Sequence, residues 1–115
     1  MSYRATQTGV LDAAGVAAAN LVTLPCRHQV PVIPCFALAG TFTGTVVLEA
    51  TLDNVNWFAC DFVKSSASAT PVTSATTTGI YTQTGPTPLP LHYRVRCSAY
   101  TSGSIEVTLT LLPVS

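Results

Sequence analysis

The clearest pattern in the sequence is a strict alternation of apolar and polar side chains over residues 92–112. A period of two is typical of a strand with one buried face and one solvated face. One parity consists of the apolar residues Tyr93, Val95, Cys97, Ala99, Ile105, Val107, Leu109 and Leu111. Gly103 ends a small polar turn between the two halves, where a positive φ is commonly needed. The pattern predicts a β-hairpin, in which Arg94, Arg96 and Glu106 share the solvent parity and can pair across the strands.

A second hairpin is predicted over residues 45–63. The positions Val46, Leu48, Ala50 and Leu52 alternate with their neighbours, and the turn sequence DNVN follows at residues 53–56. Because Asp and Asn favour turns, the pair Asp53-Asn54 is better explained by turn formation than by calcium binding. The return strand covers residues 57–63. Cys60 there has the parity of Phe58 and Phe62, which predicts three inward side chains.

Shorter apolar runs supply the remaining strands. They lie at residues 21–24, 36–39 and 80–83, with a further short edge strand near Val72. Turn signals recur about every ten residues, and this spacing is typical of an all-β fold built from two packed sheets. We therefore predict an antiparallel β-sandwich of seven or eight strands. Its pattern fits a jelly-roll and an immunoglobulin-like topology equally well.

The first 25 residues are expected to form an extended N-terminal arm, leaving residues 26–115 as the sandwich domain. The stretch LDAAGVAAAN contains small residues without the three-four spacing of a core-facing helix. A short helix from Asp12 to Ala19 is the alternative, but Gly15 in its middle would cost about 1 kcal/mol relative to alanine. An extended arm of this length can lie across a neighbouring subunit.

The composition describes a weakly charged chain of 115 residues, enough for one domain. Charged residues make up 9%, against about 25% in an ordinary soluble domain, and the formal net charge is +0. Copies of such a protein repel one another weakly, so the composition favours a subunit of an assembly. The five cationic residues are scattered, which argues against nucleic-acid binding. We find no signal peptide and no membrane-spanning run, and expect synthesis in the host cytoplasm.

The residues that carry chemistry form no recognisable site. Cys26, Cys35, Cys60 and Cys97 lack a Cys-x-x-Cys pair, so we expect no metal and predict free thiols, with a Cys26–Cys35 bridge as the alternative. No acid lies close in sequence to either histidine, His28 or His92. The acids carry no motif either, and nothing singles out Glu49 and Asp61 as a glycosidase pair. We expect a protein that is not an enzyme and needs no cofactor.

Aromatic residues are the remaining candidates for binding. Trp57, Tyr81, Tyr93 and Tyr100 are of the type that carbohydrate-binding sandwiches use as stacking platforms. Trp57 opens a strand that also contains Phe58 and Phe62, which favours burial in the core or at an interface. Carbohydrate binding is therefore the weaker interpretation of these residues.

Three segments resemble a family of small structural proteins encoded by tailed bacteriophages and prophages. They read LAGTFTGTVVLEATLDNVNWF, TTTGIYTQ and YRVRCSAYTSGSIEVTLTL. The family motifs correspond to Gly40 to Thr45, Leu48 to Asp53, Trp57, Gly79 to Tyr81, and Tyr93 to Gly103. The resemblance covers about residues 38 to 112. It implies a virion β-sandwich, of a kind used for capsid decoration or cement and also in tails, baseplates and fibres.

The function that the resemblance implies is capsid decoration on the exterior of the virion. The expected partners are the major capsid protein and neighbouring copies of this chain, in a homo-oligomer for which a homotrimer is one candidate, and no nucleic acid or membrane. A tail, baseplate or fibre-attachment component and a carbohydrate-binding module are the alternatives. The candidate partner contacts are Tyr3, Arg4, Trp57, Tyr81 and Tyr100.

Overall fold

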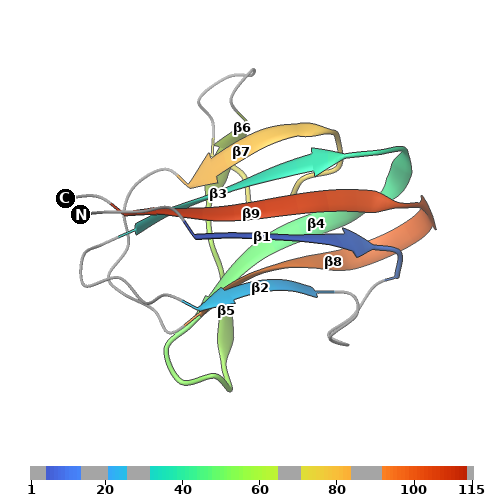
Figure 1. Cartoon of the computed structure of the whole chain (residues 1–115). Coiled ribbons are helices and arrows are strands. Elements are labelled where there is room, and N and C mark those ends of the chain that lie inside the picture. The colour runs from blue at the N-terminus through green and yellow to red at the C-terminus, as the bar shows by residue number, and fades with distance from the viewer. Residues whose placement is uncertain (1–4, 14–20, 26–31, 65–70, 84–91, 114–115) are drawn as a thin grey trace.

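The computed structural model describes residues 5–13, 21–25, 32–64, 71–83 and 92–113 (Figure 1). All regular elements in these ranges are strands, which confirms the predicted all-β class. They are β1 (Ala5–Leu11), β2 (Leu21–Pro25), β3 (Val32–Ala39), β4 (Phe42–Thr51), β5 (Trp57–Ala59), β6 (Phe62–Lys64), β7 (Gly79–Gln83), β8 (His92–Gly103) and β9 (Ile105–Pro113). Nine strands are therefore described where seven or eight were predicted. The segment near Val72 forms only an isolated bridge to Phe62.

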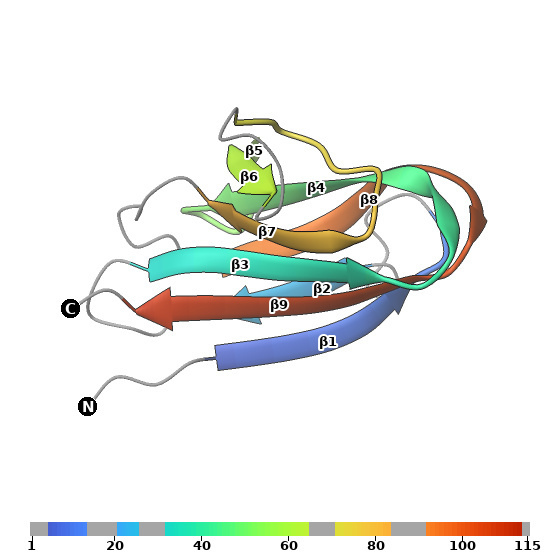
Figure 2. The same ribbon diagram turned by 90° about the horizontal axis from the view of Figure 1, so that it is seen from above.

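The strands form two antiparallel sheets that face each other (Figure 2). Sheet A has the order β1-β9-β3-β7-β6 and sheet B the order β2-β8-β4-β5. Four of the pairs are nested along the chain: β1 with β9, β2 with β8, β3 with β7 and β4 with β5. The first half of the chain thus pairs with the second half in reverse order, and the β4–β5 turn is where this antiparallel ribbon folds back.

The inner faces of the two sheets enclose an aromatic cluster. Phe36 lies with its ring edge-on to Phe62 at a centroid distance of 5.0 Å and stacks on Tyr81 at 5.1 Å. Both phenylalanines are fully buried. The Tyr81 hydroxyl donates a hydrogen bond of 2.7 Å to the carbonyl oxygen of Thr77, so the one polar group of the cluster is satisfied.

The alternation over residues 92–112 assigns the buried faces correctly, with one exception. Seven of the eight residues predicted to be buried are at most 1% exposed: Tyr93, Val95, Cys97, Ile105, Val107, Leu109 and Leu111. Ala99 is exposed, because β8 is bulged against β4: Val46 pairs with Cys97 and the preceding Thr45 pairs with Ala99. The extra residue, Ser98, reverses the parity beyond it.

The predicted hairpin between residues 92 and 112 is wrong in its pairing. β8 lies in sheet B and β9 in sheet A, so the chain crosses between the sheets at Gly103, which has a φ of 91°. The backbone N–H of Ser104 donates a hydrogen bond of 3.1 Å to the carbonyl oxygen of Thr41, and this bond holds the crossing. Alternation specifies which face of a strand is buried, but the same pattern arises when two strands face each other across a core.

Replacing Gly103 by alanine should destabilise the fold by about 1–3 kcal/mol. A Cβ atom at this position would overlap the carbonyl oxygen of Thr41, and the positive φ disfavours any residue with a side chain. Urea unfolding of this variant measures the loss. Ser102→Ala, at an exposed neighbouring position, is the control. Equal urea midpoints for Gly103→Ala and Ser102→Ala would contradict the close approach of Gly103 to Thr41.

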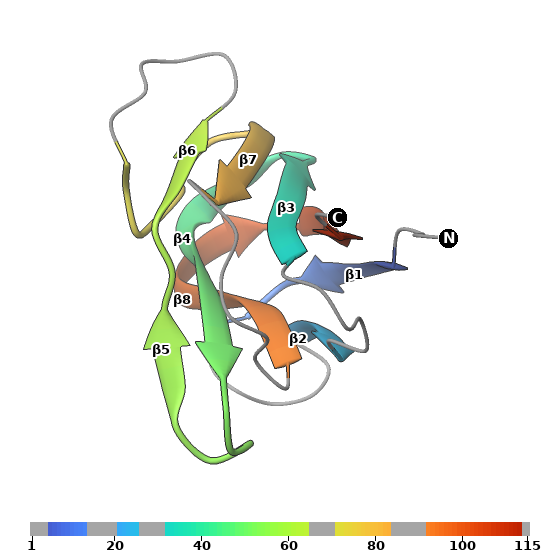
Figure 3. The same cartoon turned by 90° about the vertical axis from the view of Figure 1, so that its left-hand side faces the viewer.

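The predicted return strand over residues 57–63 is divided between the two sheets. β5 pairs with β4 in sheet B, and β6 pairs with β7 in sheet A. The N–H of Cys60, between them, donates to the carbonyl oxygen of Leu48 at 2.9 Å. Phe62 is buried as predicted, whereas Phe58 is 64% exposed. Figure 3 shows that the β4–β5 hairpin projects beyond the facing sheet, and Phe58 belongs to β5 of this hairpin.

The expected arm over residues 1–25 is replaced, in the residues that the structure describes, by two strands of the sandwich, and the second of them confirms the strand predicted at residues 21–24. β1 pairs with β9 from Ala5–Leu111 to Leu11–Ile105, and β2 pairs with β8. Leu11, Val22 and Leu24 are buried in the core, and this apolar burial is the physical reason that these segments dock. Residues 1–4 and most of the alternative helix lie outside the described ranges.

Candidate interaction surface

A cluster of one acid and two arginines lies on the outer face of sheet B. Glu49 of β4 is directly opposite Arg94 of β8. Arg96 is opposite Val47, which is two residues before Glu49 on the same face of β4. The Arg94 Nε donates a hydrogen bond to Glu49 Oε1 at 2.7 Å. Arg96 donates two hydrogen bonds to the same carboxylate, from Nε to Glu49 Oε1 at 3.0 Å and from Nη2 to Glu49 Oε2 at 3.1 Å. The Arg94 guanidinium also stacks on the ring of Trp57, 4.0 Å from its centroid. The cluster therefore ties β4, β5 and β8 together.

The electrostatics of this cluster favour an ionised carboxylate. Burial raises the pKa of Glu49, but the hydrogen bonds and charges of Arg96 and Arg94 outweigh it, so the pKa lies below its ordinary value of 4.5. The hydrogen bond with Glu49 correspondingly raises the pKa of Arg96. Glu49 is only 8% exposed and both its oxygens accept hydrogen bonds from arginine. This arrangement is a brace within the sheet.

The β4–β5 turn is organised by Asp53. Its Oδ1 accepts hydrogen bonds from the backbone N–H groups of Val55 at 2.9 Å and Asn56 at 2.8 Å, and its Oδ2 accepts one from Asn56 Nδ2 at 2.9 Å. The backbone hydrogen bonds from Asn56 and Val55 lower the pKa of Asp53 to about 2. Asn54 takes the left-handed conformation with a φ of 65°, which asparagine tolerates better than most residues. The turn formation predicted for Asp53-Asn54 is confirmed.

This ordered turn carries three exposed apolar side chains, which we call the hairpin tip: Leu52, Val55 and Phe58. They are 68%, 76% and 64% exposed. Single apolar side chains on a surface are ordinary, but several on one projecting and internally hydrogen-bonded hairpin indicate an interaction site. Leu52 is the last apolar position of the alternation over residues 46–52, and it is exposed because β4 ends at Thr51 and the chain then leaves the sandwich.

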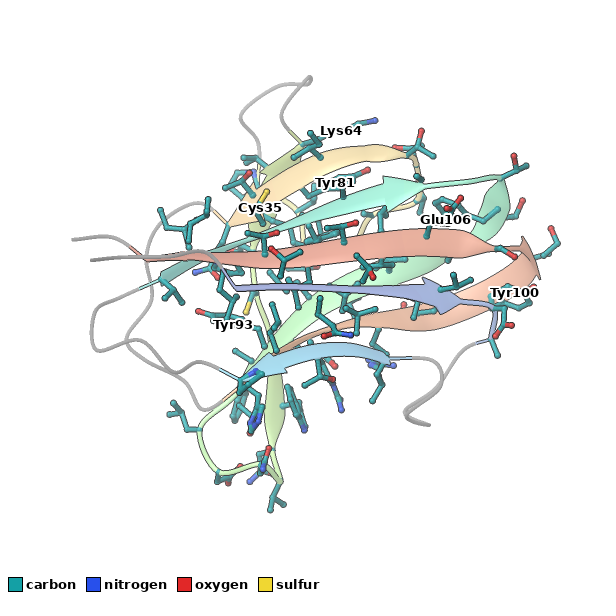
Figure 4. All side chains as sticks on the ribbon, viewed as in Figure 1. Cys35, Lys64, Tyr81, Tyr93, Tyr100 and Glu106 are labelled. Carbon is teal, nitrogen blue, oxygen red and sulfur yellow. The ribbon has the colours of Figure 1, made fainter. Side chains whose placement is uncertain are left out.

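The aromatic residues predicted as partner contacts have different positions. Tyr81 is 3% exposed inside the core, so its ring is not available at the surface. Trp57 is half-buried, with Arg94 over its ring. Tyr100 is half-buried near the β8–β9 crossing, where its hydroxyl donates to the carbonyl oxygen of Gly103 at 2.7 Å (Figure 4). Tyr3 and Arg4 lie outside the described residues.

Sequence reasoning missed the hairpin tip. Phe58 is predicted to face inward because it has the parity of Cys60 and Phe62, and Leu52 continues the alternation of Leu48 and Ala50. The available signal was Val55 inside the turn sequence DNVN, since an apolar side chain at the apex of a tight turn has no core to face. Val55 therefore indicates a role for the hairpin beyond the connection of β4 to β5.

The cysteines of the described segments are not paired with one another. Cys35, Cys60 and Cys97 are free thiols, and Cys97 donates a hydrogen bond to the carbonyl oxygen of Ala99. Burial, together with the charges of Asp61 and Glu49, raises the pKa of Cys60 to about 11, so this thiol is poorly nucleophilic. Cys26 and His28 are not among the described residues. Within the ranges given above, no three His, Cys, Asp or Glu side chains gather as metal ligands.

The fold and this surface define the chain as a two-sheet antiparallel β-sandwich with a projecting apolar hairpin. Among solved structures it is similar to the crystal structure of SPBc2 prophage-derived protein YomS, with a TM-score of 0.70, 10% sequence identity and coverage of 97% of this chain and 96% of that chain. At this identity the likeness shows the fold alone. No protein-family model and no curated protein matches the sequence. In the described part of the chain, no helix is long and apolar enough to cross a membrane.

Proposed function

We propose that this chain is a virion structural protein of a tailed bacteriophage or prophage, and that it decorates the exterior of the capsid. Two observations of different kinds support a phage origin. The segments between residues 38 and 112 resemble phage structural proteins, and the similar fold belongs to a protein described as prophage-derived. A fold can host many functions, so the specific role is argued from the surface.

We assign the sandwich to the jelly-roll class rather than to the immunoglobulin-like class. The nested pairs β1·β9, β2·β8, β3·β7 and β4·β5 describe one antiparallel ribbon wound around the core. Viral capsid domains are among the proteins that use double-sheet jelly rolls. Strand β6 extends sheet A by one strand beyond this scheme. This topology supports a structural role in a virion.

The hairpin tip is the observation that carries the proposal. Its three apolar side chains are held by a turn whose hydrogen bonds centre on Asp53, so little conformational entropy is lost when they become buried. Seated at a junction between capsid subunits, they would bind only the assembled shell. Ligands that bind only one state stabilise it by mass action, which is how the bound protein would strengthen the shell. Neighbouring copies of this chain would occupy equivalent junctions, as a homotrimer where three junctions meet.

The role that we propose is non-catalytic and requires no cofactor. The acids best placed to do chemistry are already engaged: Glu49 accepts hydrogen bonds from two arginines, and Asp53 organises a turn. Carbohydrate stacking would need exposed aromatic faces. Arg94 lies over the Trp57 ring and Tyr81 lies in the core, so these two rings are poor platforms for stacking on a sugar.

Adding purified protein to heads that lack it tests this assignment. The double variant Leu52→Ser, Phe58→Ser should reduce occupancy at least tenfold at a subsaturating concentration, because the apolar contact is lost. The control is Val72→Ser, Ile80→Ser, which removes two other exposed apolar side chains, 41% and 54% exposed, from outside the hairpin. Circular dichroism checks that both variants fold. Full occupancy by the hairpin variant would refute the proposed contact.

A further inference from the structure

The outer edge of β1 is an open sheet edge in the described structure. β1 pairs with β9 on one side, and no described strand pairs with its other side (Figure 2). The pairing runs over seven residues without a register shift, so the strand has no bulge. Thr6, Gln7 and Thr8 are exposed, and Val10 is 49% exposed. An edge of this kind presents a row of unpaired backbone N–H and C=O groups.

The other sheet edges are protected by devices that β1 lacks. β5 and β6 have three residues each, and β6 ends in Lys64. β2 has five residues and ends in Pro25, which has no N–H to donate. The sequence of β1, ATQTGVL, contains no charge and no proline. Natural proteins usually blunt a free edge with short strands, charges, prolines or bulges, so an edge with none of these features is suited to receive another strand.

We propose that a second copy of this chain pairs with β1 through its own β1, antiparallel and related by a two-fold axis at Thr8. In that register Thr8 faces its own copy, Thr6 faces Val10, and Gln7 faces Gly9. No charges are opposed, and the longest side chain of the strand meets the smallest. A second copy always supplies a strand of the same length and alternation, which makes the edge self-complementary.

The adjoining face of sheet A shows that such threonine pairs form in this molecule. Thr6 is opposite Thr110 in β9, and their hydroxyl oxygens lie 3.3 Å apart in a cross-strand hydrogen bond. Thr8 is likewise opposite Thr108. Facing threonines at the two-fold axis would extend these polar rows into the second copy. Because the net charge of the chain is +0, the two copies approach without long-range repulsion.

The pairing goes beyond the function proposed above: it is a two-fold contact between copies in solution, separate from the three-fold arrangement proposed on the capsid. Sheet A would then run through both copies as one continuous sheet, a form of strand addition at an exposed edge. The hairpin tip belongs to sheet B and stays free in this arrangement. The contact forms in solution without a capsid, so its failure and the failure of the decoration proposal are separate results.

Sedimentation equilibrium of the full chain tests the pairing. Wild type should show a monomer–dimer equilibrium, and Thr8→Lys should raise its dissociation constant at least tenfold, because two like charges would face each other at the axis. The control is Thr108→Lys, which adds the same charge at an exposed position directly opposite Thr8, one strand inside the edge. It should stay within threefold of wild type. Equal weakening by the two variants would overturn the proposal.

Hydrogen exchange of the wild-type protein provides a second test that depends on no variant. Amides on alternate residues of β1, those facing away from β9, should become protected as the protein concentration rises through the dissociation constant. A chain that is monomeric at all concentrations, with these amides unprotected, would overturn the pairing. Protection that appears only on capsids would also overturn it, since the strand added at β1 would then belong to the capsid protein.

Discussion

Replacing Phe36 by alanine should lower the free energy of unfolding by about 3–5 kcal/mol. Phe36 is fully buried and contacts both other rings of the aromatic cluster, at centroid distances of 5.0 Å to Phe62 and 5.1 Å to Tyr81. Close-packed interiors relax only partly around a deleted ring, so a cavity adds to the lost transfer free energy. Since small domains are stable by only about 5–15 kcal/mol, this variant should lose a large part of its stability.

The matched control for this prediction is Phe58→Ala, the same chemical change at a side chain that is 64% exposed. We expect this variant to unfold within about 0.5 kcal/mol of wild type. Chemical denaturation followed by tryptophan fluorescence measures both variants, with Trp57 as the only tryptophan of the chain. A larger loss from Phe58 than from Phe36 would show that the two phenylalanines have been assigned to the wrong sides of the sheet.

Replacing Glu49 by alanine should destabilise the fold by about 3 kcal/mol at pH 7. The variant leaves Arg94 and Arg96 without their carboxylate partner, and their side chains are only 11% and 23% exposed. Removing one partner of a buried ion pair costs more than the pair itself contributes, because the remaining charges stay poorly solvated. Glu106→Ala is the control, since Glu106 is an exposed acid in sheet A. Its loss should stay within about 0.5 kcal/mol.

A comparison of wild type with Glu49→Ala isolates the contribution of Glu49 to stability in acid. The pKa of Glu49 is lower in the folded chain than its ordinary value of 4.5, so its contribution is fully present above about pH 4.5 and is lost as the pH falls through the folded-state pKa. Wild type should therefore lose more stability than Glu49→Ala between pH 7 and pH 3. Asp53, whose pKa is about 2 in the folded chain, contributes an acid-labile term to both proteins. If the stability of wild type and of Glu49→Ala fell in parallel with pH, the result would contradict a stabilising interaction between Glu49 and the two arginines.

The side-chain pattern of the sequence was sufficient to predict the buried faces, since period-two alternation reports which side of a strand meets the core. It could not predict strand pairing. Gly103 appeared to close a hairpin, but β8 and β9 join different sheets, because either arrangement buries the same parity of side chains. Residues 57–63 likewise keep the alternation of one strand while crossing from sheet B to sheet A. Pairing depends on contacts between distant segments, which local patterning does not encode.

The buried position of Leu11 and the exposed positions of Leu52 and Phe58 could not be predicted from local sequence, for related reasons. Leu11 lies in a weakly apolar run that looks like part of an arm until β9 supplies an edge to dock on. The strand predicted at residues 21–24, by contrast, is confirmed as β2. Leu52 and Phe58 continue the parity of core positions, yet both are exposed. The β4–β5 hairpin projects beyond the facing sheet (Figure 3). Whether a side chain of inward parity is covered depends on how far the facing sheet reaches.

The copy number of this protein in purified virions tests its assignment as a capsid decoration protein most directly. Quantitative mass spectrometry against the major capsid protein gives the ratio, and antibody labelling seen by electron microscopy gives the location. We expect hundreds of copies per particle, all on the head surface. A few copies confined to the tail or baseplate, or none in the particle, would contradict capsid decoration.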